Sequence, residues 1–172
     1  NIQNKKFDFP GHTDYLASKL KGESLMFMIS EELKVGLLTD HIPIKEVHSN
    51  ITIKKIKEKF SLISKSLECD FGIQKPKIAV LSLNPHSGED GKMGNEEKEV
   101  IIPAINKLKE SGVLIKGPVA ADSMFHSDII KDYDLAICMY HDQALIPIKT
   151  ISFYDAVNVT LGLPLFRTSP DH

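Results

Sequence analysis

Three histidines in this sequence follow apolar runs that are typical of buried β-strands. His41, His86 and His141 each stand a few residues past the end of such a run. In open α/β sheets the carboxyl ends of the strands line the crevice where ligands bind. Imidazole is a common ligand of divalent metal ions, so three imidazoles at that edge predict a metal site. Their spacing matches no short metal motif, and a lone histidine at a strand end is usually a polar loop residue, so the prediction depends on the fold.

Two carboxylates accompany these histidines. Asp142 directly follows His141, and Asp122 ends the segment Gly117-Pro-Val-Ala-Ala-Asp122. Either carboxylate can orient a metal-bound imidazole or hold a water molecule on the metal. The alternative role for each is that of a helix cap or turn residue.

A second group of side chains is suited to a phosphate. Lys149, Asn158 and Arg167 lie in otherwise apolar segments. Lysine, arginine and an amide are the usual donors to a phosphomonoester. The alternative is three solvated surface side chains. His12 and Thr13, after a glycine turn, add a donor and a hydroxyl.

The order of the strand and helix patterns predicts an α/β fold with a mainly parallel sheet covered by helices. Apolar residues at three- and four-residue spacing from Ile53 predict an amphipathic helix that stops near Gly72. A second stripe covers residues 100–108, where Pro103 should kink the helix or mark where it restarts. The predicted strands are 23–30 and 33–39, which form a hairpin, then 77–83, and 134–140 after a short helix near 123–131.

Composition restricts the classes of partner. The 172 residues are 42% apolar and 26% charged, as expected for one domain with a substantial core. A formal net charge of -2, the absence of a basic block and the absence of Trp argue against a nucleic-acid partner. No apolar run approaches the roughly 18 residues that span a bilayer, so we expect a cytoplasmic protein without a membrane partner. Cys69 and Cys138 are far from any CxxC spacing and are expected to be buried free thiols.

Several short motifs follow one another in a characteristic order. They are Gly11-His-Thr-Asp14, Thr39-Asp-His-Ile-Pro43, Leu83-Asn-Pro-His-Ser-Gly-Glu89, Gly117-Pro-Val-Ala-Ala-Asp122, Tyr140-His-Asp-Gln143, and Val157-Asn-Val-Thr-Leu-Gly-Leu-Pro164 with Arg167-Thr-Ser169. In this order the sequence resembles the 4-hydroxythreonine-4-phosphate dehydrogenase family of pyridoxal phosphate biosynthesis. The likeness runs through nearly the whole chain, and the motifs together are far more specific than any one alone.

The resemblance implies a three-layer α/β fold like that of isocitrate and isopropylmalate dehydrogenases. It also implies a homodimer of two-domain subunits with the active site in the interdomain cleft. The three histidines match the family's ligands of a divalent metal ion, which would be zinc, or else magnesium or cobalt, and one of them is supplied by the neighbouring subunit. The positions that match the family's substrate-binding residues are His12, Thr13, Lys149, Asn158 and Arg167.

The implied reaction is oxidation of 4-phosphohydroxy-L-threonine by NAD or NADP. Its product is a β-keto acid that decarboxylates to 3-amino-2-oxopropyl phosphate. The divalent ion would lower the pKa of the substrate hydroxyl, and Asp142 and Lys149 are the candidates to accept the hydroxyl proton. Two alternatives stay open: a paralogous dehydrogenase of another phosphorylated hydroxy acid, and a non-catalytic domain stabilised by zinc.

The chain differs from the family in its length. The resemblance implies that residues 1–172 are one α/β unit, mostly the central domain of a larger subunit. A region before the Gly-His-Thr motif and the C-terminal loop that holds the adenosine end of the cofactor are expected to be absent. His172 is the residue expected to reach the cofactor, and the fragment alone is expected to be inactive.

Overall fold

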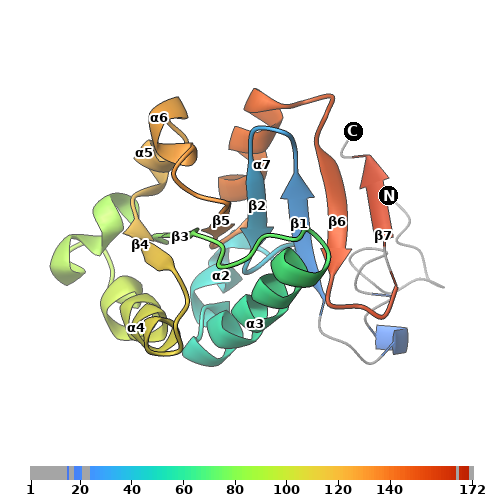
Figure 1. The fold of residues 1–172 in the computed structure, drawn as a ribbon. Helices are drawn as coiled ribbons and strands as arrows, with labels where there is room; N and C mark the ends of the chain where they lie inside the picture. Colours follow the sequence, from blue (N-terminus) through green and yellow to red (C-terminus); the bar gives the residue numbers. More distant parts are fainter. Residues whose placement is uncertain (1–14, 16–17, 21–23, 166, 171–172) are drawn as a thin grey trace, which may run out of the picture.

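A seven-stranded mixed sheet lies between two layers of helices (Figure 1). The computed structural model describes residues 15, 18–20, 24–165 and 167–170. The strands are β1 (Leu25–Ile29), β2 (Lys34–Leu37), β3 (Ile78–Leu81), β4 (Ile115–Val119), β5 (Leu135–Cys138), β6 (Val157–Leu161) and β7 (Arg167–Pro170). The helices are α2 (Ile44–Asn50), α3 (Ile53–Cys69), α4 (Ile102–Glu110), α5 (Ala121–Met124), α6 (Ser127–Ile130) and α7 (His141–Ile151). Two further helical segments, η1 (Pro85–Gly91) and η2 (Glu97–Ile101), connect β3 to α4.

The sheet has a parallel half and an antiparallel half. The strand order is β4-β3-β5-β2-β1-β6-β7. The pairs β3–β4, β3–β5 and β2–β5 are parallel, whereas β1–β2, β1–β6 and β6–β7 are antiparallel. The expectation of a mainly parallel sheet is therefore wrong. The predicted hairpin β1–β2 is confirmed, and the chain after α7 returns beside it as two further antiparallel strands.

The parallel half determines where the histidines lie. β5 runs between β2 and β3, with Ala136 opposite Val35 on one side and Ala79 on the other. Because parallel neighbours point the same way, the carboxyl ends of all these strands meet at one edge of the sheet. The segments that carry His41, His86 and His141 therefore start from adjacent strand ends.

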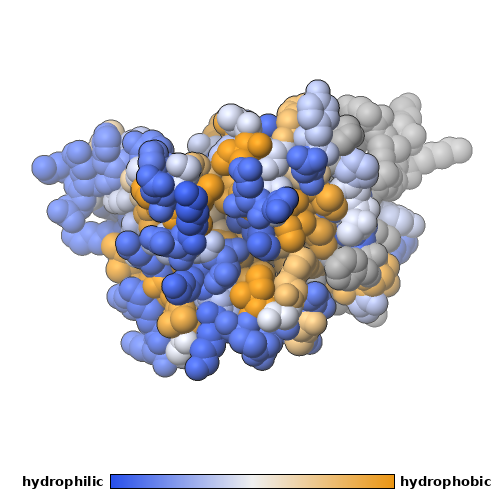
Figure 2. Space-filling model, turned by 45° about the horizontal axis from the view of Figure 1, so that its top comes forward, coloured by the Kyte–Doolittle hydropathy of each residue, from blue (hydrophilic) through white to orange (hydrophobic). Residues whose placement is uncertain are grey.

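Each face of the sheet carries its own apolar core. Phe27, Val80 and Ile137 pack with the helices α3 and α4 on one face. Met28, Ala79 and Cys138 pack with α7 on the other. Neighbouring strand residues alternate between the two faces, as the period of two in a β-strand requires. Hydrophilic side chains cover most of the surface in Figure 2, with smaller apolar areas between them.

Helix α3 confirms the amphipathic pattern that begins at Ile53. The hydroxyl of its N-cap Thr52 accepts a hydrogen bond from the Lys55 backbone N–H (3.2 Å). Gly72, just past the helix end, has a φ of 67° that favours glycine. In the described ranges of the chain, no helix is both long enough and apolar enough to cross a membrane.

The second predicted helix begins with an irregular turn. The backbone N–H of Ile102 bonds to the carbonyl of Glu97, five residues earlier, so η2 is a π-helical turn. α4 then starts, with Pro103 in its first turn, where a missing N–H is tolerated. Pro103 therefore marks where the helix restarts. The single helix expected near residues 123–131 is instead the two short helices α5 and α6.

The two cysteines differ in their environments. Cys138 is buried and Cys69 is exposed, and both are free thiols. The expectation that both are buried is wrong for Cys69, which is the last residue of α3. Burial raises the pKa of the Cys138 thiol well above its usual value. Cys138 is therefore a core residue with a protonated, unreactive thiol.

Candidate metal centre and its surroundings

His41 and His141 face one another at the carboxyl edge of the sheet. Their ring centroids are 5.5 Å apart and the rings are inclined by 48°. Two imidazoles that bind one tetrahedral ion, with Zn–N distances of about 2.0–2.1 Å, have ring centres about 5 Å apart. The observed pair therefore has the separation that a shared metal ion requires.

The pair opens into a pocket of about 290 Å³. Its lining residues are Asp40, His41, Ile42, Ile44, Val47, Tyr140, His141 and Asp142. His141 Nδ1 lies 2.7 Å from Asp142 Oδ1, and the exposed fractions of the two side chains are 35% and 70%. With the Nδ1 proton directed at the carboxylate, the Nε2 lone pair of His141 is left for a metal ion. Asp142 therefore lies where it can orient the His141 ring, and its role toward a metal ion stays a prediction.

Two polar side chains fasten the strand ends that carry the histidines. The Thr39 hydroxyl donates to the Met139 carbonyl (2.6 Å) and joins the ends of β2 and β5. The Gln143 amide accepts from the Met139 N–H (2.7 Å) and donates to the Ser82 carbonyl (2.9 Å), which joins β5 to β3. Neither Thr39 nor Gln143 was predicted, although each stands two residues from a candidate ligand.

His86 lies on a loop with an unusual backbone. Residues 86–90 all have positive φ values, with His86 at 52°. For a residue other than glycine this left-handed conformation costs about 1–2 kcal/mol. Four of the five residues are not glycine, so the surrounding structure must hold the loop in place. His86 itself is exposed.

Within one chain His86 does not complete the histidine pair. Among the residues that the structure describes, no three His, Cys, Asp or Glu side chains are grouped so that they could hold a metal ion. His41 and His141 are brought together, and His86 starts from the next strand end, that of β3. One chain therefore presents two imidazoles at the candidate centre.

A carboxylate pair stands behind the His86 loop. The Glu97 side chain is 2% exposed, and Glu96 lies beside it. The Asn84 side-chain amide donates to both carboxylates, each at 2.8 Å. The hydrogen bond from Asn84 and the Glu96 backbone N–H lower the pKa of Glu96 below its usual 4.5.

The depressed pKa of Glu96 predicts an effect on acid stability. Because the folded-state pKa lies below the unfolded value, the contribution is present above about pH 4.5 and is lost as the pH falls through the folded-state pKa. In Glu96→Gln the free energy of unfolding should therefore decrease less steeply as the pH falls through that acid range. Urea unfolding across the range measures it, with Glu99→Gln, an exposed glutamate of the same turn, as the control. The same pH dependence of the free energy of unfolding in wild type and Glu96→Gln would contradict the depressed pKa of Glu96.

The predicted phosphate ligands share the α7 side of the sheet. Asn158 pairs with Met28, whose side chain packs in the core beneath α7, so Asn158 faces that side too. Arg167 Nη1 donates to the hydroxyl of Thr160 (3.3 Å), the next residue of β6 on this face. The Lys149 ammonium lies 6.0 Å from the centre of the Phe153 ring.

These three residues belong to elements away from the histidine pair within one chain, since β6 and β7, which carry Asn158 and Arg167, are two and three strands from β2. Lys149 is eight residues after His141 on α7, a rise of about 12 Å along the helix axis. Asn158 Oδ1 is buried and has no hydrogen-bond partner among the described residues. Three other predicted residues, His12, Thr13 and His172, lie outside the described part of the chain.

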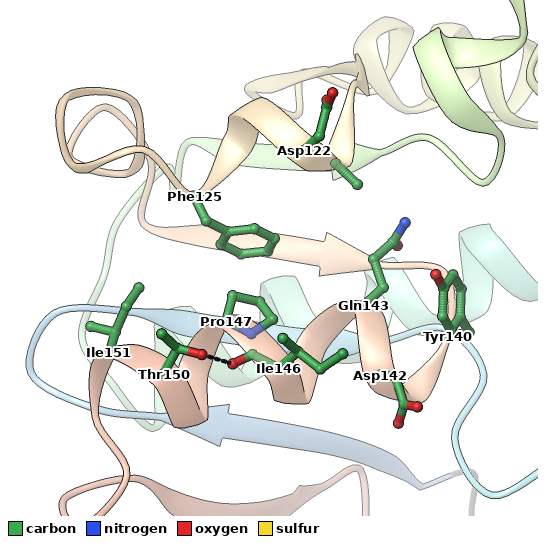
Figure 3. A pocket seen from close by; sticks show the side chains of 10 residues that line it. Asp122, Phe125, Tyr140, Asp142, Gln143, Ile146, Pro147, Thr150 and Ile151 are labelled. Atoms are coloured by element: carbon green, nitrogen blue, oxygen red, sulfur yellow. Dashed lines mark hydrogen bonds between the residues drawn. The ribbon is translucent and has the colours of Figure 1, made fainter.

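Asp122 lines a larger pocket between α5 and α7. The pocket has a volume of about 420 Å³, and Asp142 contributes to its other wall. In Figure 3 the two carboxylates point away from one another, and the Phe125 ring lies over Pro147. Among the described residues Asp122 forms no hydrogen bond to a histidine, so its predicted orienting role is not visible within one chain.

Comparison with known sequences places the chain in a family. Residues 1–172 match the model of the pyridoxal phosphate biosynthetic protein PdxA. The 4-hydroxythreonine-4-phosphate dehydrogenase of Sulfurihydrogenibium sp. (strain YO3AOP1) is 49% identical over 99% of this chain and 53% of its own length. The enzyme of that name from Bacteroides thetaiotaomicron is 46% identical over 99% of this chain and 48% of its own length.

A solved structure agrees with the sequence relatives. The crystal structure of 4-hydroxythreonine-4-phosphate dehydrogenase from Klebsiella pneumoniae superposes with a TM-score of 0.86 at 37% identity. The match covers 96% of this chain and 50% of that one. This chain spans about half the length of the curated relatives that it matches. On the match of its whole length, the chain belongs to the family of the pyridoxal phosphate biosynthetic protein PdxA.

Proposed function

We propose that the protein is a metal-dependent 4-hydroxythreonine-4-phosphate dehydrogenase that uses NAD or NADP. The relatives described above carry this enzyme name. The observation that carries the metal dependence is the His41–His141 pair, 5.5 Å apart, with His141 oriented by Asp142. The pair lies in an open pocket, which favours a catalytic site over a closed structural zinc site.

His41 and His141 of one chain would hold the metal, which we expect to be zinc, magnesium or cobalt. In a homodimer the third imidazole would come from a second copy of the chain, where His86 is exposed on its loop. When bound, the ion supplies Lewis acidity that lowers the pKa of the substrate hydroxyl. The shared site makes the dimer a condition of activity.

The remaining residues bind the substrate and move its proton. Lys149, Asn158 and Arg167 would hold the phosphate through charged and amide donors. Asp142 stands beside His141 and is mostly exposed, so it is the nearer candidate to accept the hydroxyl proton, with Lys149 the other. NAD or NADP, when bound, accepts the hydride. The dinucleotide part of the proposal rests on the family, because His172 lies outside the described residues.

A coupled assay of the intact subunit tests the proposal, because residues 1–172 alone are expected to be inactive. With 4-phosphohydroxy-L-threonine and NAD or NADP, we expect reduction of the cofactor and release of carbon dioxide in equal amounts. A chelator should abolish both, because carbon dioxide is lost only from the β-keto acid that the metal-dependent oxidation forms. Addition of zinc, cobalt or magnesium should restore both. Turnover that survives complete metal removal would refute the metal dependence. Equal rates with the dephosphorylated substrate would refute the phosphate specificity.

A further inference from the structure

Glu97 is a buried carboxylate at the base of the loop that carries His86. Its Oε1 accepts hydrogen bonds from the backbone N–H groups of Leu83 and Asn84, both at 2.8 Å. Its Oε2 accepts from the Asn84 side-chain amide, also at 2.8 Å. These donors belong to the two residues just before Pro85, where the loop begins. One carboxylate therefore fixes the point at which the chain leaves β3.

The same carboxylate also contacts the loop beyond His86. Gly88 is buried, and a Cβ built on it would lie 2.8 Å from Glu97 Oε2 and 3.0 Å from the Gly94 carbonyl oxygen. The loop is thus packed against Glu97 on both sides of the histidine. Since the His86 side chain is exposed, its left-handed backbone depends on these two attachments rather than on packing of the ring.

Glu97 lies on the buried side of the helical turn η2. Glu97 and Ile101 are 2% and 0% exposed, and they lie at the two ends of the π-helical turn η2. Irregular turns of this kind are frequent at functional sites. A carboxylate without partners would be strongly unfavourable here, so its burial requires the three donors from the loop. The acid and the loop conformation therefore depend on one another.

We propose that Glu97 is a positioning residue that holds His86 where it can bind the metal, without touching the metal itself. The inference rests on the proposed metal-dependent function. It assigns Glu97 a role in metal affinity as well as in folding. Removing a side chain that orients a metal ligand typically lowers metal affinity about 10- to 100-fold.

Metal affinity of the purified dimer tests the proposal. The zinc dissociation constant, from competition with a chromophoric chelator, is compared for wild type, Glu97→Leu, Glu97→Gln, Glu96→Gln and His86→Ala. We expect Glu97→Leu to weaken binding about 10- to 100-fold and to change the visible spectrum of bound cobalt. Glu97→Gln keeps an oxygen that can accept from the two backbone N–H groups, so its zinc affinity should fall less than that of Glu97→Leu. Glu96→Gln removes one negative charge at the neighbouring residue and should bind zinc with the wild-type affinity.

Two outcomes separate this proposal from the proposed function. If Glu97→Leu keeps the wild-type affinity and cobalt spectrum while His86→Ala loses them, the positioning role is wrong and the metal site stands. If His86→Ala binds zinc as tightly as wild type, the metal site itself is wrong at that position. Should Glu97→Leu fail to fold, the comparison of Glu97→Gln with Glu96→Gln decides, because equal affinities of these two variants would overturn the positioning role.

Discussion

Replacing either His41 or His141 by alanine is expected to lower metal affinity by more than about 100-fold, which exceeds the usual effect of losing an orienting partner. Each change removes one imidazole from a pair whose ring centres are 5.5 Å apart. Turnover should fall at least as much, since the remaining ligands bind the ion weakly. Metal content after dialysis, together with the zinc dissociation constant, measures the loss.

A graded series tests the geometry behind this expectation. Asp142→Asn keeps the size of the side chain but weakens the 2.7 Å contact with His141 Nδ1, so metal affinity should fall about 10- to 100-fold. His126→Gln is the matched control, because His126 is exposed and its Nδ1 lies against Asp128 at the start of α6, where it accepts the Asp128 backbone N–H (3.3 Å). A variant of His41 or His141 that retains wild-type metal content would remove the basis of the proposed centre.

The positions of the histidines at strand ends could be predicted, but not which of them meet. Their closeness depends on β5 lying directly beside β2, a pairing between segments about 100 residues apart in the chain. Hydrophobic patterns identify strands without giving their order in a sheet. The contacts of Thr39 and Gln143 depend on the same order, because each joins two neighbouring strand ends.

Glu97 had a signal in the sequence that the prediction did not use. It stands four residues before Ile101, in register with the apolar stripe that continues through Ala104 and Leu108. A charged residue in such a stripe is rarely buried unless it has partners. The partners could not be predicted, because they are backbone groups of a loop whose left-handed conformation has no pattern of its own.

The two last strands of the antiparallel half, β6 and β7, were not predicted, for a different reason. No strand is predicted for residues 157–170, which enter the predictions only as candidate phosphate ligands and motifs of the family. β7 (Arg167–Pro170) has a partly exposed edge position and a terminal proline, which edge strands tolerate. Its pairing with β6 nevertheless brings Arg167 to the same face as Asn158.

Lys149→Met and Arg167→Met are each expected to lower kcat/KM for the phosphorylated substrate about 10- to 100-fold, because a hydrogen bond to a charged group contributes about 1.5–3 kcal/mol. The activity with the dephosphorylated substrate should change little, since the lost contact is absent from it. Lys107→Met is the matched control: this exposed lysine lies on α4, on the opposite face of the sheet. Steady-state kinetics with both substrates measure the difference.

The same kinetics distinguish the two roles proposed for Lys149. As a phosphate ligand, its loss raises KM for the phosphorylated substrate and leaves kcat with the dephosphorylated substrate unchanged. As the proton acceptor, its loss lowers kcat with both substrates. Its place about 12 Å along α7 from His141 favours the phosphate role within one chain. The opposite result would be an equal fall in kcat for both substrates in Lys149→Met, while Arg167→Met affects only the phosphorylated substrate. That result would assign the role of proton acceptor to Lys149 and leave Asp142 to orient His141.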